Sequence, residues 1–159
     1  MRKIFPGLFI IASIFLSGCS TSMKIEEPYT PQQGSLLEYD ILLGSNMSKQ
    51  GLEIFRSRIN EKLNERGRLA SAPVEAQEKV VINITEYRMR HGATRAMLGI
   101  FAGTDRIKST VIVKDKKSNK KISEFKVQSG NASAWGTSRG MIQDHADQIV
   151  TYLTAGKIE

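Results

Sequence analysis

Cys19 is the only cysteine of the 159-residue chain, and its thiol is the side chain best placed for covalent chemistry. Two basic residues, Arg2 and Lys3, precede an apolar run over residues 8–16, and Ser-Gly separates this run from Cys19. A basic start, a short apolar segment and small residues before the cleavage point are the three parts of a secretory signal peptide. The pattern predicts a secretory signal peptide that ends at the small residues before Cys19.

The sequence Leu16-Ser17-Gly18-Cys19 resembles the lipobox of bacterial lipoproteins. The resemblance implies a lipoprotein signal peptide over residues 1–18, a diacylglyceryl group on the Cys19 thiol and, usually, an acylated amino group. Two or three acyl chains make a durable membrane anchor, whereas a single chain binds only marginally. Ser20 stands where an aspartate tends to retain such proteins at the inner membrane. The resemblance therefore implies a lipid-anchored protein on the periplasmic face of the cell outer membrane.

Other residues offer little for catalysis or metal binding. The two histidines, His91 and His145, lie far apart, and neither an H-E-x-x-H motif nor a phosphate-binding glycine loop occurs. No G-x-S-x-G or S-x-x-K motif surrounds a serine. His145 falls on the apolar stripe of a predicted helix, where we expect a core-edge histidine bonded to a backbone carbonyl. We expect no catalytic residue, no metal and no cofactor.

Positive charge is concentrated in residues 79–126, which carry twelve basic and four acidic side chains, a balance of +8. One interpretation is a face that meets an envelope protein or an anionic surface. The other is a solvated sheet edge that lysines protect from aggregation. Nucleic acid fits the sign of the charge but not the compartment of an exported protein, so we expect no nucleic-acid partner.

The segment 91–106 combines three glycines with apolar and basic side chains. It is a candidate for insertion into a membrane or a partner groove, or its apolar residues turn inward and cap the core. Trp135 is either an interface residue or a buried lid. The candidate interaction residues are Arg95, Met97, Leu98, Ile100, Phe101, Arg106 and Trp135.

The remaining pattern predicts one α+β domain over residues 36–155. Residues 19–35 are polar and contain two prolines, which indicates a lipidated flexible tether. Apolar alternation and three- to four-residue periodicity predict the following elements: strands 37–43, 80–89, 107–114 and 121–128, a helix 49–66 with Ser48 as N-cap and Gly67 as stop, and a helix 138–154. The order strand-helix-strand-strand-strand-helix predicts a small two-layer sandwich, with both helices on one face of a mixed or antiparallel sheet.

A family resemblance rests on the segment from Val80 to Phe125. A strand ending in Ile-Thr-Glu-Tyr, a glycine loop containing Arg95 and a lysine-rich hairpin follow in the order found in the bacterial lipoprotein family called domain of unknown function 4410. Asn119 stands where that family usually has glycine, and asparagine also tolerates a positive φ. The resemblance implies an envelope location and a small α+β domain, and it implies no activity.

Two functions remain open. The chain is either a non-catalytic interaction or assembly accessory of an envelope complex, or a periplasmic lipoprotein that binds lipid or a small ligand between its sheet and helices.

Overall fold

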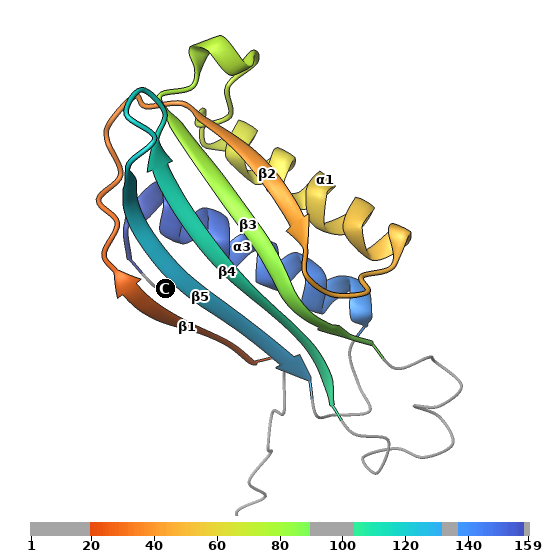
Figure 1. Ribbon diagram of the computed structural model, residues 1–159. Helices are drawn as coiled ribbons and strands as arrows, with labels where there is room; N and C mark the ends of the chain where they lie inside the picture. The colour runs from red at the N-terminus through yellow and green to blue at the C-terminus, as the bar shows by residue number, and fades with distance from the viewer. Residues whose placement is uncertain (1–19, 90–103, 132–136, 158–159) are drawn as a thin grey trace, which may run out of the picture.

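The structure, a computed structural model, describes residues 20–89, 104–131 and 137–157, which form a five-stranded sheet with two α-helices packed on one face (Figure 1). The elements are β1 (Ser20–Glu27), β2 (Leu37–Leu43), α1 (Lys49–Glu65), the 3₁₀ turn η1 (Pro73–Glu75), β3 (Glu78–Arg88), β4 (Asp105–Asp115), β5 (Lys121–Asn131) and α3 (Ser138–Ala155). The predicted α+β class, with the order β-α-β-β-β-α and helices packed against a mixed sheet, is confirmed. An additional strand, β1, precedes that order.

The strands lie in the order β1-β5-β4-β3-β2. Only β2 and β3 run parallel, because α1 carries the chain back between them. The three other pairs are antiparallel. In the turn between β4 and β5, Asn119 has a φ of 55°, which confirms that asparagine occupies a left-handed position here.

Strand β1 corrects the prediction for the N-terminal segment. The flexible tether predicted over residues 19–35 is wrong for Ser20–Glu27, because these residues pair antiparallel with β5. Within this strand, Met23 packs against the core opposite Val127. The strand has few apolar residues of its own, and the open edge of β5 supplies the partner that makes it a strand. The described domain therefore begins at Ser20 and not at residue 36.

Alternation of apolar and polar residues builds the core, because successive strand residues face opposite sides of a sheet. Inward-facing strand residues are fully buried: Val80, Ile82, Ile84, Ile107, Val111, Val113 and Phe125. The helices add Phe55, Ile59 and Leu63 from α1, and Met141, Ile142, Ile149, Tyr152 and Leu153 from α3. Burying a side chain of this size contributes about 1.5–3 kcal/mol of transfer free energy.

Both helices carry the end signals expected of them. The Ser48 hydroxyl accepts a hydrogen bond from the Gly51 amide at 3.1 Å, which confirms the predicted N-cap of α1. Thr137 caps α3 in the same way, through the Gly140 amide at 3.0 Å. The observed helix ends lie within one residue of those predicted.

Candidate functional site

Among the described residues, no element covers the face of the sheet opposite the helices, over all five strands (Figure 1). On the three inner strands the residues of this face alternate with the buried ones, and many carry charge. The basic residues are Lys79, Arg88, Arg106, Lys108, Lys114 and Lys126, and Lys24 joins them from β1. We call this surface the open sheet face.

The basic segment does not lie at the edge of the sheet. The described part of residues 79–126 forms most of β3, all of β4 and the first half of β5, whereas the edges are β1 and β2. For these residues the interpretation as a lysine-decorated sheet edge is therefore wrong. The excess of positive charge seen in the sequence is also reduced in space, because the edge strands bring carboxylates from distant parts of the chain onto the same face.

Ion pairs across neighbouring strands produce this balance. Lys79 lies 2.7 Å from Asp40 of β2, and Lys126 lies 3.0 Å from Glu26 of β1. Glu86 on β3 forms ion pairs with two residues of β4, Lys108 at 2.8 Å and Arg106 at 3.7 Å. The hydrogen bond from Lys108 holds the pKa of Glu86 below its usual value. Exposed pairs of this kind contribute little stability, because water and salt screen them. They make the open sheet face a mosaic of both signs.

A shallow hollow of about 260 Å³ lies on the open sheet face. Three lysines from three strands, Lys24, Lys108 and Lys126, stand around it, and hydroxyl and amide groups line it. The polar lining residues include Ser22, Thr85, Thr110 and Gln128. Ligand pockets for small molecules are usually about 300–1,000 Å³ and mostly enclosed. The size and the openness of this hollow fit one acidic or amide side chain of a partner better than an enclosed ligand.

The structure places only one of the candidate interaction residues. Arg106 lies on β4, opposite Arg88 of β3, with 41% of its side chain exposed. The other candidates, Arg95, Met97, Leu98, Ile100, Phe101 and Trp135, lie outside the described residues, and so does Cys19.

His145 has a different environment from the one predicted. It is fully buried, and its ring nitrogens bond the hydroxyls of Ser109 on β4 and Ser129 on β5, each at 2.8 Å. Its expected position on the apolar stripe of the last helix is confirmed, but its partners are serine hydroxyls and not a backbone carbonyl. Burial lowers the pKa of His145 to about 3, so the ring is neutral at neutral pH.

A serine bonded to a histidine is also the arrangement of an activated nucleophile. Here Ser109 and Ser129 are at most 1% exposed and His145 is 0% exposed, so no substrate atom reaches either hydroxyl. The buried polar groups satisfy one another instead. The hydroxyl of Ser129 also lies 2.8 Å from that of Thr21, so the network joins β1, β5, β4 and α3.

A second buried polar cluster joins residues far apart in the chain. The Tyr29 hydroxyl donates a hydrogen bond to Glu78, the first residue of β3, and Arg68 lies 3.8 Å from the same carboxylate oxygen. Burial and the neighbouring Glu78 carboxylate raise the pKa of Tyr29 well above its ordinary value. The sequence analysis missed this cluster and the two serines. The sequence could have indicated the two serines, since both stand at inward-facing positions of strands in which buried and exposed residues alternate.

No helix among the described residues is long and apolar enough to cross a membrane.

Comparison with known proteins identifies the family of this chain. Residues 44–134 match the family model described as domain of unknown function (DUF4410). The chain belongs to this family. A search of the curated proteins gave no match.

Solved structures share the fold at low sequence identity. A PelC dodecamer from Paraburkholderia phytofirmans has a TM-score of 0.60 at 11% identity, over 86% of this chain and 98% of that one. A leucine-to-methionine variant of that PelC, also a dodecamer, has a TM-score of 0.62 at 11% identity, over 85% and 98%. Lipoprotein GNA1162 from Neisseria meningitidis is similar at a TM-score of 0.49 and 14% identity, over 76% and 98%.

Proposed function

We propose that this chain is a lipoprotein of the outer membrane, anchored through Cys19 on the periplasmic side, and that it acts as a non-catalytic assembly module of an envelope complex. The open sheet face carries the proposal. A sheet with both faces available normally buries one and leaves the other to water or to a partner. In this chain the second face is five strands wide, has a charge mosaic and a hollow, and has no covering element in the described residues.

The charge mosaic suits a protein partner. Alternating signs on a surface select an orientation and reject partners with the wrong pattern, whereas a surface of one sign attracts any opposite charge. Lys108 and Lys126 beside Glu86 and Glu26 provide such a pattern within a few strands. A protein partner with an acidic or amide side chain opposite the hollow would complement it.

We propose a second copy of the chain as a further partner, which adds at an edge of the sheet and not on the open sheet face. PelC from Paraburkholderia phytofirmans, which has a similar fold, forms a dodecamer. In this chain β1 and β2 are the two edge strands, and the pairing directions make them antiparallel to each other. A copy that continued the sheet would therefore place its β1 antiparallel to β2. In the single chain, β2 leaves Leu42 52% and Leu43 47% exposed. Unpaired edge groups next to exposed apolar residues favour such an addition.

Crosslinking in cells tests the assembly function. A photo-reactive amino acid at Thr110, in the centre of the open sheet face, should crosslink to one defined envelope protein. The same probe at Glu53, on the exposed side of α1, is the matched control and should give no specific product. Products from Glu53 alone would show that the helical layer, and not the open sheet face, meets the partner.

Two further measurements test the anchor and the self-assembly. Palmitate labelling that disappears in Cys19→Ala is expected for the anchor, and labelling that persists would exclude it. Native mass spectrometry should show oligomers that dissociate in Leu42→Lys, because a charge at an edge strand opposes pairing. Extraction of a tightly bound lipid or small molecule from a monomer would instead favour the ligand-binding function.

A further inference from the structure

We propose that the end of the domain at which β1 begins rests directly on the lipid bilayer, with Arg88 and Arg106 against the phosphates of anionic headgroups. This inference rests on the proposed lipidation of Cys19 and adds the orientation of the domain and the residues that touch the membrane. It follows from the position of β1, from the pairing register of the sheet and from the way β1 is held.

The pairing register places four residues in one row across the sheet. Ser20 of β1 lies opposite Gly130 of β5, Gly130 lies opposite Arg106 of β4, and Arg106 lies opposite Arg88 of β3. Neighbouring strands are about 4.8 Å apart. The backbone of Arg106 is therefore about 10 Å from that of Ser20, and the backbone of Arg88 is about 14 Å from it.

The reach of the anchor decides how far this row can be from the membrane. Ser20 is already part of β1, so a single peptide unit of about 3.8 Å separates it from Cys19. A flexible tether over residues 20–35 would have allowed sixteen residues and an extended reach of about 55 Å. Because only one peptide unit joins Ser20 to Cys19, acyl chains in the bilayer keep Ser20 at the headgroup level. The guanidinium groups of the same row then lie within side-chain reach of headgroup phosphates.

The start of β1 is held firmly to the rest of the domain. Thr21, the second residue of the strand, bonds Ser129, and Ser129 bonds the buried His145 of α3. Ladder pairing continues from Ser20 to Glu27. Moving the row away from the bilayer would require this buried network to open, so the strand acts as a rigid connection between the anchor and the sheet.

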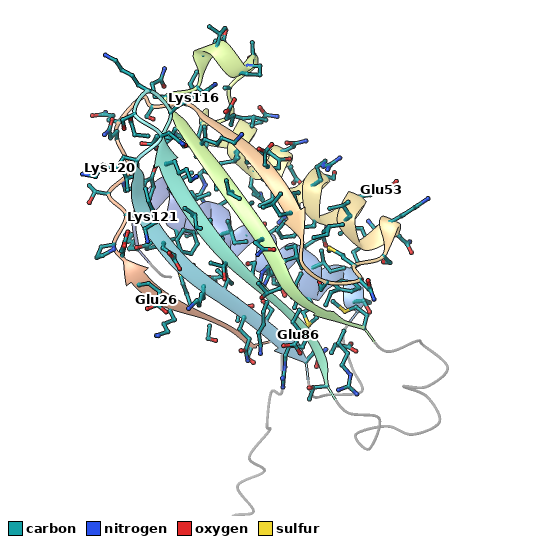
Figure 2. All side chains as sticks on the ribbon, viewed as in Figure 1. Glu26, Glu53, Glu86, Lys116, Lys120 and Lys121 are labelled. Atoms are coloured by element: carbon teal, nitrogen blue, oxygen red, sulfur yellow. The ribbon has the colours of Figure 1, made fainter. Side chains whose placement is uncertain are left out.

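Charge alone does not select this end of the domain. The hairpin at the opposite end carries Lys116, Lys120 and Lys121, while Glu86 marks the end near the arginine row (Figure 2). Strand β4 separates the two ends by about 33 Å, at 3.3 Å per residue over Asp105–Asp115. The anchor brings only the arginine row to the surface. There each basic side chain adds about fivefold to binding of an anionic membrane.

Fluorescence quenching by the membrane tests the orientation. The full lipidated chain is placed in vesicles of phosphatidylethanolamine and phosphatidylglycerol that contain a spin-labelled lipid. Because lipid occupies Cys19, a dye reacts only with an introduced cysteine. Gln128 lies on β5, two residues inside the arginine row, and Lys117 lies in the distant hairpin; both side chains are exposed, and each is replaced by cysteine in turn. We expect quenching several-fold stronger at residue 128 than at residue 117. Equal quenching at the two residues, on a chain whose mass shows acylation, would overturn the proposed orientation but not the proposed anchor.

Lengthening the connection isolates the contribution of the arginines. A sixteen-residue Gly/Ser segment between Ser20 and Thr21 should weaken quenching at residue 128 but leave it above that at residue 117. Arg88→Gln with Arg106→Gln should then abolish the remaining difference, whereas Lys120→Gln with Lys121→Gln, an equal loss of charge at the other end, should preserve it. A difference that survives the arginine changes would overturn the headgroup contact. A mass without acyl groups would overturn both this inference and the proposed anchor.

Discussion

Arg58 of α1 and Asp147 of α3 connect the two helices through two parallel hydrogen bonds, from Nε to Oδ1 at 2.6 Å and from Nη2 to Oδ2 at 2.7 Å. The pair lies at the surface, with side chains 22% and 33% exposed. Two-point geometry distinguishes it from ordinary surface ion pairs, since the planar guanidinium matches both carboxylate oxygens.

The first prediction concerns this connection. In a double-mutant cycle of Arg58→Gln and Asp147→Asn, chemical denaturation should give a coupling free energy of about 1 kcal/mol, limited by solvent screening. The Lys62–Glu65 pair within α1, at 2.5 Å, is the matched control and should give a clearly smaller coupling, because its carboxylate is more exposed. Equal couplings would mean that the two-point geometry adds nothing.

The second prediction is a pH dependence caused by His145. Its pKa is about 3 in the folded chain, against 6.5 for a histidine in water, so the unfolded chain binds one more proton between these values. As the pH is lowered from 6.5 towards 3, the free energy of unfolding should therefore decrease by about 1.4 kcal/mol per pH unit. Carboxylates also titrate in this range, so the test is the difference in slope between the natural chain and His145→Gln, followed by urea titration. Parallel slopes would refute a buried neutral histidine.

The third prediction compares two glycines that follow helices. Gly67 and Gly156 have φ values of 61° and 67°, but an added Cβ at Gly67 would meet no atom within 4 Å, whereas at Gly156 it would lie 2.7 Å from Cδ of Pro31. Gly67→Ala should cost about 1 kcal/mol of stability for the left-handed backbone alone. Gly156→Ala should cost more, because α3 would have to move away from Pro31. Thermal unfolding of both variants checks this, and equal losses would contradict the close packing.

The fourth prediction concerns the Tyr29 hydroxyl. Tyr29→Phe leaves the Glu78 carboxylate, 3% exposed, without the hydroxyl that donates to it. We expect a loss of about 2–3 kcal/mol in the free energy of unfolding. Tyr39→Phe is the control, since its hydroxyl meets Asn60 Oδ1 at 2.6 Å in a more exposed position, and it should cost about 1 kcal/mol. A smaller loss for Tyr29→Phe than for Tyr39→Phe would show that Arg68 satisfies the carboxylate alone.

Local patterns were sufficient for most of the fold. Helix α1 follows from the spacing of Phe55, Ile59 and Leu63 and from its cap Ser48, because these signals lie within one short segment. Strand β1 could not be predicted in this way. Its residues are mostly polar, and its conformation is set by pairing with β5, about a hundred residues later in the chain.

Charge shows the same limit at the candidate site. A count along the sequence assigns +8 to residues 79–126, but it cannot show that Asp40 and Glu26 stand beside Lys79 and Lys126. Those neighbours depend on the order β1-β5-β4-β3-β2, which the chain alone does not display. The environment of His145 escaped prediction for the same reason, because its two serines come from different strands.

The place of β1 in the sheet also sets an order of events during biogenesis. Ser20 pairs with Gly130, so β1 finds its partner only after most of the chain has been synthesised. Contacts between residues this distant form late, because a long loop must close first. On the proposed lipidation of Cys19, acylation and cleavage next to Ser20 would precede this pairing, and the sheet would then close over a finished anchor.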